Sequence, residues 1–95
     1  MTAYVVVHAK IKDPEKLGVY AKAAGPTLAA HGGKFAARAP ILETLTGDAD
    51  YDVFVLIEFP DADSARNWYQ SAAYQALIPN RDEAADMLFT LAESA

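Results

Sequence analysis

The residues most capable of chemistry in this sequence are His8, Arg38 and Glu58, because each places an ionisable group within an apolar segment. A guanidinium pairs well with a carboxylate or an enolate, and a carboxylate or an imidazole can move a proton. If the three side chains share a pocket, we expect Arg38 to bind a small anionic or phenolic molecule. Glu58 or His8 would then act as the catalytic acid or base.

A purely structural role for the same residues remains open. Arg38 and Glu58 can instead form a salt bridge, and His8 can be a hydrogen-bonded interface histidine. A buried ion pair of this kind needs further hydrogen bonds, because removing either ion from water costs several kcal/mol. The alternative function is therefore a non-catalytic dimerising module whose pocket is filled by its own side chains, and the sequence does not decide whether the protein is an enzyme.

The segment YDVFVLIEF, residues 51–59, is the element that must position these groups. It is rich in β-branched and aromatic residues, and acidic or proline-containing turns flank it on both sides. Alternation separates two faces, each mostly apolar, which is typical of a central strand covered on both sides. One face carries Val53, Val55, Ile57 and Phe59, and the other carries Asp52, Phe54, Leu56 and Glu58.

The remaining elements are predicted from hydrophobic spacing and from cap and turn residues. They are a strand over 3–12, a helix from Asp13 to Gly32 that contains Pro26, a weaker strand over 34–45 that contains Pro40, a polar turn over 46–50, a helix from Asp61 to Gln70, a helical turn over 71–77 that Pro79 ends, a polar helical or irregular segment over 81–86, and a strand over 87–92.

This order, β-α-β-β-α-β, predicts one α+β domain over residues 1–95 with a ferredoxin-like fold. Its antiparallel four-stranded sheet carries both helices on one face. The opposite face would expose Val6, Phe54, Leu56 and Leu88, a large apolar patch for a soluble monomer. We therefore expect a homodimer in which two such faces meet. Alternation also assigns His8, Arg38 and Glu58 to this face, and so predicts the ligand pocket between the two sheets.

Composition excludes several other classes of function. The net charge is −5 and the lysines are scattered, which argues against a nucleic-acid partner. No apolar run is long enough to span a bilayer. Cysteine is absent, which suits a reducing cytoplasm. Two isolated histidines make a poor metal site and no phosphate-binding motif is present, so we expect neither a metal nor another cofactor.

The chain resembles the DUF1330 family, a domain of unknown function, over nearly its whole length. The resemblance lies in YVVVHAKIKDPEKL, in AAGPTLAAHGGKF with Arg38, and most strongly in E-F-P followed by A-x-x-W-Y and S-x-x-Y-Q-A-L-x-x-x-R. It departs from the family at Thr46, where an acidic residue is common. The resemblance implies a dimeric α+β barrel, whose wider relatives include cofactor-independent monooxygenases, lactone isomerases and haem-degrading enzymes.

The family pattern also supplies candidate ligand-binding residues. They are Tyr20, Arg38, Trp68, Tyr69, Ser71, Tyr74 and Arg81, with Glu58 as a further pattern position. A packing role is open for each of the aromatic residues among them. Trp68 and Tyr69 are expected in the core, and Tyr20, Tyr74 and Arg81 either line the mouth of the pocket or pack elsewhere.

Overall fold

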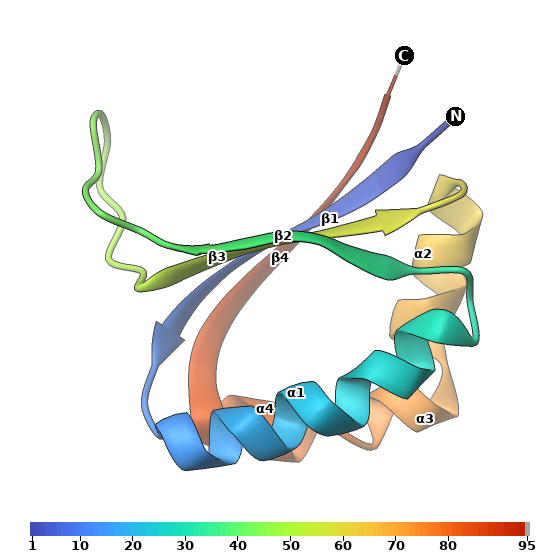
Figure 1. The fold of residues 1–95 in the computed structure, drawn as a ribbon, viewed down its shortest axis with the longest axis horizontal. Coiled ribbons are helices and arrows are strands. Elements are labelled where there is room, and N and C mark those ends of the chain that lie inside the picture. Colours follow the sequence, from blue (N-terminus) through green and yellow to red (C-terminus); the bar gives the residue numbers. More distant parts are fainter. Residues whose placement is uncertain (95) are drawn as a thin grey trace.

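A computed structural model describes residues 1–94 of the chain as one four-stranded antiparallel sheet with helices on one face (Figure 1). The strand order is β2-β3-β1-β4, which is the predicted ferredoxin-like topology. The elements are β1 (Ala3–Ile11), α1 (Pro14–Ala29), β2 (Lys34–Pro40), β3 (Val53–Phe59), α2 (Ala62–Gln70), α3 (Ala72–Gln75), α4 (Ile78–Ala84) and β4 (Ala85–Glu93).

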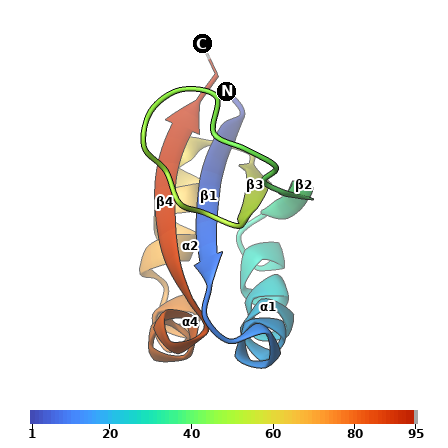
Figure 2. The same cartoon turned by 90° about the vertical axis from the view of Figure 1, so that its left-hand side faces the viewer.

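The two central strands, β1 and β3, form the floor of the core. They pair antiparallel with Val5 opposite Ile57 and Val7 opposite Val55, so the side chains of these four residues lie on the face that carries the helices. Figure 2 shows β1 between β3 and β4, with α1 and α4 side by side at one end of the sheet. The prediction of residues 51–59 as a central strand is confirmed, although the strand begins at Val53.

Helix α1 begins and ends where its cap residues predict. The Asp13 carboxylate accepts hydrogen bonds from the backbone N–H groups of Glu15 and Lys16. The helix continues through Pro26 as a single element. Beyond its end, Gly32 adopts a φ of 75°, a conformation that favours glycine.

The segment between α2 and β4 differs from the prediction. Pro79 was expected to end a helical turn, yet it lies in the first turn of α4. Proline is tolerated there because the first N–H groups of a helix have no partner within it. The polar residues 81–86 consequently complete α4 and begin β4, which is longer than predicted at both ends.

Strand β2 is shorter than predicted and its register is irregular. It ends at Pro40 rather than near Leu45, and residues 41–52 form a loop that projects beyond the sheet (Figure 1). A register shift between Phe35 and Ala37 interrupts its pairing with β3. A bulge of this kind reverses which residues face which side of a strand. Phe35 pairs with Ile57 and Arg38 pairs with Val55, so both face the helices.

The second face of the sheet has no covering layer within residues 1–94 (Figure 1). The strand registers place Val6, Phe54, Leu56 and Leu88 on this open face, as predicted. Leu88 is 45% exposed. No helix within the part of the chain that the structure describes is long and apolar enough to cross a membrane.

Candidate functional site

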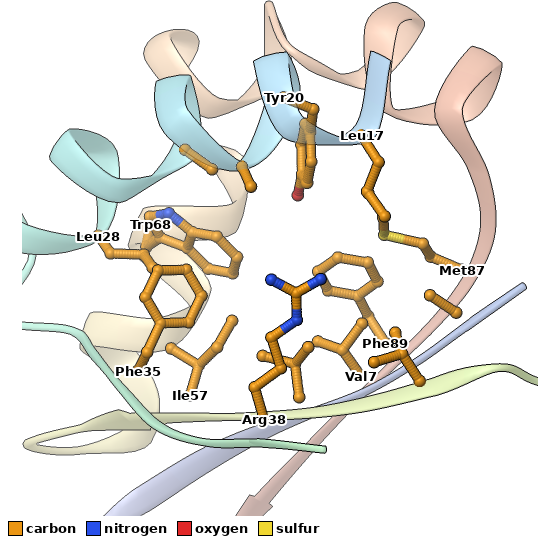
Figure 3. Close-up of a pocket in the computed structure, with 15 residues that line it drawn as sticks. Val7, Leu17, Tyr20, Leu28, Phe35, Arg38, Ile57, Trp68, Met87 and Phe89 are labelled. Carbon is orange, nitrogen blue, oxygen red and sulfur yellow. The ribbon is translucent and has the colours of Figure 1, made fainter. Parts of the chain in front are cut away.

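A cavity of about 220 Å³ lies between α1 and the sheet, inside a single chain (Figure 3). Its walls come from α1, from all four strands and from Trp68 of α2. They are almost entirely apolar, and the polar side chains that reach the cavity are those of Tyr20, Arg38 and Trp68. The other lining residues include Leu17, Leu28, Phe35, Ile57, Met87 and Phe89.

Arg38 enters this cavity from the edge strand β2. Figure 3 shows its side chain rising from the strand, with the guanidinium directed toward the hydroxyl of Tyr20. Within residues 1–94, Arg38 forms neither an ion pair nor a side-chain hydrogen bond. The cavity therefore presents a guanidinium whose charge no side chain within residues 1–94 neutralises.

The predicted convergence of His8, Arg38 and Glu58 is wrong. Glu58 lies opposite Tyr4 of β1 and Lys34 of β2, on the open face, and His8 lies opposite Phe54 on that same face. The bulge in β2 turns Arg38 to the other side of the sheet. Strict alternation had assigned all three residues to one face, and one inserted residue breaks that rule. Neither proposed proton-transfer residue lines the cavity that contains Arg38.

Tyr20 belongs to a buried network of hydroxyl groups and a guanidinium. The Tyr20 and Tyr74 hydroxyl oxygens lie 2.7 Å apart. Arg81 Nη1 donates to Tyr74 Oη and to Tyr69 Oη, at 3.1 Å each. Arg81 also stacks against Phe89, with its Cζ atom 4.9 Å from the ring centroid. Arg81 does not line the cavity, whereas the Phe89 ring forms part of its wall.

Trp68 is both a core residue and a wall of the cavity. Its side chain is 1% exposed, and its ring contacts Phe59 and Tyr74. Its Nε1–H group donates to Thr27 Oγ1 at 3.0 Å, and Thr27 donates in turn to the carbonyl of Ala24. The indole N–H group is thus already satisfied, which leaves the Trp68 ring as an apolar surface toward a ligand.

Ser71 and Tyr69, two other family-pattern residues, support the site from outside it. Ser71 caps α3, because its Oγ accepts from the Tyr74 N–H group and donates to the Trp68 carbonyl. Tyr69 accepts from Arg81 and packs on Trp68. Of the seven predicted ligand-binding residues, the cavity lining includes Tyr20, Arg38 and Trp68.

Sequence reasoning missed most of the apolar lining. Strict alternation places Phe35 and Arg38 on opposite faces of β2, and the bulge brings both side chains to the helix face, where they line the cavity. Met87 and Phe89 lie two residues apart in the last predicted strand, so alternation places them on one face, and this was the signal that could have identified them as cavity residues.

The pKa values of the network groups follow from their burial. Burial raises the pKa of Tyr20 far above its ordinary value of 10.0, and the neighbouring Tyr74 hydroxyl adds to the effect. Burial also raises the pKa of Tyr74, although its hydrogen bonds with Tyr20 and Arg81 oppose the shift. Burial acts to lower the pKa of Arg81, but hydrogen bonds to the Tyr69 and Tyr74 oxygens raise it overall.

The raised pKa of Tyr20 predicts a loss of stability in alkaline solution. Below pH 10 the phenol is protonated in both the folded and the unfolded chain. Above pH 10 only the unfolded chain ionises readily, so the free energy of unfolding falls by up to about 1.4 kcal/mol per pH unit for this residue. Urea unfolding between pH 8 and 11 should show a shallower decline for Tyr20→Phe than for the wild type. An equal decline of the unfolding free energy with pH in the two proteins would contradict the prediction.

The described residues contain no group of three or more His, Asp or Glu side chains positioned to hold a metal ion. Chemically, the cavity offers hydrogen-bond donors, aromatic walls and one uncompensated positive charge. Its lining contains no carboxylate and no imidazole. This arrangement can bind and stabilise an oxyanion, whereas it supplies no carboxylate or imidazole to act as a general base.

Solved structures share this fold at low sequence identity. A protein of unknown function from Rhodopseudomonas palustris, RPA0582, is 18% identical, with a TM-score of 0.77 over 99% of this chain and 82% of its own. SnoaB, a cofactor-independent oxygenase from Streptomyces nogalater, is 13% identical, with a TM-score of 0.73 over 99% and 93%. A dimeric ferredoxin-like protein of unknown function from Thermobifida fusca is 14% identical, with a TM-score of 0.65 over 96% and 89%.

No curated protein sequence matches the chain. The family model for a domain of unknown function, DUF1330, matches residues 2–95, which is almost the entire sequence. The match agrees with the motifs around Trp68 and Arg81 and with the ferredoxin-like topology. The chain belongs to the DUF1330 family.

Proposed function

We propose that the cavity between α1 and the sheet binds a small organic acid, phenolate or enolate, with Arg38 pairing with its negatively charged oxygen. The observation that carries the proposal is the orientation of this guanidinium into an apolar cavity whose lining contains no carboxylate. A guanidinium forms strong, often bidentate hydrogen bonds with an oxyanion. Apolar walls with a few convergent polar groups are typical of small-molecule sites.

The size of the cavity limits the ligand to about one ring. Cavities of about 150 Å³ accommodate benzene, and sites for drug-sized molecules begin at about 300 Å³. A volume of about 220 Å³ therefore suits a monocyclic or short-chain compound. The same volume argues against the alternative of a pocket filled by side chains.

Any conversion of this ligand would depend on stabilisation of an anion. Arg38 would stabilise negative charge on a bound enolate or phenolate, which is the principle of an oxyanion site. Glu58 and His8 are not part of this proposal, because they lie on the open face. The structural likeness to SnoaB, a cofactor-independent oxygenase, supports small-molecule chemistry only as an analogy between folds.

We further propose that the protein is a cytoplasmic homodimer whose two open faces meet. The partly exposed Val6, Phe54 and Leu56 and the exposed Leu88 support this arrangement, since an uncovered apolar sheet face is unfavourable in water. The dimeric ferredoxin-like protein from Thermobifida fusca provides a precedent for the fold. The absence of cysteine fits the cytoplasm.

The Arg38→Met variant should bind benzoate about 10- to 100-fold more weakly than the wild type. A hydrogen bond to a charged group contributes about 1.5–3 kcal/mol, and methionine retains the apolar stem without the charge. Trp68 is the only tryptophan and lines the cavity, so its fluorescence should report binding directly. Benzyl alcohol, a neutral probe of similar shape, should lose little affinity in the same variant.

Arg66→Met is the matched control, because it removes the same charge outside the cavity. Arg66 lies on α2 and pairs with Asp63 at the surface, with Nη1 and Oδ1 3.0 Å apart. Its benzoate affinity should equal that of the wild type. The proposal fails if the wild type binds neither benzoate nor benzyl alcohol. It also fails if the two arginine variants lose benzoate affinity equally.

A further inference from the structure

The buried network behind the cavity contains more hydroxyl hydrogens than protein acceptors. The Arg81 guanidinium has only hydrogen-bond donors, so Tyr69 Oη and Tyr74 Oη must both accept from it. Tyr74 Oη also lies 2.7 Å from Tyr20 Oη. This contact uses one of the two hydroxyl hydrogens of Tyr20 and Tyr74, and within residues 1–94 the other hydrogen has no protein acceptor.

The surroundings of the two hydroxyl groups decide whether Tyr20 or Tyr74 carries the hydrogen that has no protein acceptor. Tyr74 is 0% exposed and does not line the cavity. If Tyr20 donated to Tyr74, the Tyr74 hydrogen would be buried without an acceptor, at a substantial free-energy cost. If Tyr74 donates to Tyr20, the surplus hydrogen belongs to Tyr20, whose oxygen points into the cavity in Figure 3. The second arrangement leaves no buried donor unsatisfied.

We propose that Arg81, acting through Tyr74, fixes the Tyr20 hydroxyl as a hydrogen-bond donor into the cavity, so that Tyr20 and Arg38 together select ligands with an oxygen acceptor. This inference rests on the proposed function of the cavity and specifies its ligand class. The ligand carries a carboxylate, enolate or carbonyl oxygen that both donors can reach, attached to an apolar ring or short chain. Arg81 is a positioning residue, because it does not line the cavity and reaches Tyr20 only through Tyr74.

The charges in the network also favour a hydrogen bond that Tyr74 donates to Tyr20. Arg81 polarises the Tyr74 hydroxyl by donating to its oxygen, which makes Tyr74 a better donor to Tyr20. The only ionised partner of Arg81 within the described residues is Asp82, which accepts from Nε at 3.2 Å. That carboxylate occupies a different nitrogen and leaves Nη1 to the two tyrosines.

The test compares acetophenone with ethylbenzene in the Arg38→Met background. The two probes have similar shapes, and only acetophenone carries an oxygen acceptor. With Arg38 removed, acetophenone should still bind roughly twofold to tenfold more tightly than ethylbenzene, which is the range for one neutral hydrogen bond. Adding Tyr20→Phe should abolish this advantage while ethylbenzene still binds. Amide chemical shifts followed by NMR titration would give both affinities and would confirm folding.

The Arg81→Met substitution, in the same background, separates positioning from packing. It should abolish the acetophenone advantage although Tyr20 is present, because Tyr20 can then donate to Tyr74. Arg81→Lys should restore part of the advantage, since an ammonium also donates. If Arg81→Met does not fold, the Tyr20→Phe comparison still decides whether Tyr20 donates. An equal affinity for the two probes without Arg38 overturns the inference alone. The proposed function fails separately, if the wild type binds neither benzoate nor benzyl alcohol.

Discussion

Trp68→Ala should destabilise the protein by about 3–5 kcal/mol, the range measured for removal of a large buried aromatic side chain. Trp68 is 1% exposed and contacts Phe59, Tyr74 and Phe89, so its removal leaves a void that joins the existing cavity. It also leaves Thr27 Oγ1 without the indole donor. A domain of this length has a total stability of about 5–15 kcal/mol, so the substitution should remove a large fraction of it.

Equilibrium unfolding in urea, followed by circular dichroism, measures the effect. Leu42→Ala is the control, because Leu42 is 92% exposed on the projecting loop and its truncation should change stability by less than about 0.5 kcal/mol. A loss below about 1 kcal/mol in Trp68→Ala would show that the aromatic cluster is not the centre of the core.

The fold was predictable because local signals and topology agree. Alternation in residues 51–59 and the cap residues Asp13 and Asp61 each defined an element that the structure contains. The right-handed crossover rule then left one arrangement of four strands and two principal helices. The chain order alone therefore determined which sheet face the helices cover.

The candidate site was only partly predictable, because it depends on one irregularity. A bulge between Phe35 and Ala37 decides that Arg38 faces the helices, and an alanine-rich segment gives no sign of where an extra residue lies. Arg38 stands out in the sequence as a cation in an apolar strand and lines the cavity, whereas His8 and Glu58 do not. Tyr20 and Trp68 reached the candidate list through their positions in the family pattern.

Pro79 illustrates a second limit on what the sequence predicts, namely where a helix begins. Proline ends a helix when it lies in the interior, and begins one when it lies in the first turn. The sequence around Pro79 is compatible with both readings. In the folded chain Pro79 begins a helix, and the contacts of Arg81 favour this outcome, because α4 places its guanidinium against Tyr69 and Tyr74. Tertiary contacts, rather than local preference, therefore fix the start of this helix.

Leu56→Lys should convert the proposed dimer into a folded monomer. Leu56 lies in β3 on the open face, between Val6 of β1 and Ala37 of β2. In a monomer the ammonium extends into water, so the sheet is retained. In a dimer each chain would bury one unpaired charge at a cost of several kcal/mol, which weakens association by about a thousandfold or more. Sedimentation should give twice the 10.2 kDa chain mass for the wild type and a single chain mass for the variant.

Val19→Lys provides the control for added charge. Val19 is 65% exposed on α1, away from the open face, so this variant should remain a dimer.

Benzoate binding distinguishes the two proposals, because the cavity lies within one chain. A monomeric Leu56→Lys variant that keeps its benzoate affinity would establish that the site does not need the partner. A wild type that sediments as one chain at every concentration, or a Leu56→Lys variant that remains dimeric, would mean that the open face is not the interface. The apolar open face formed by Val6, Phe54, Leu56 and Leu88 would then need a different physical explanation.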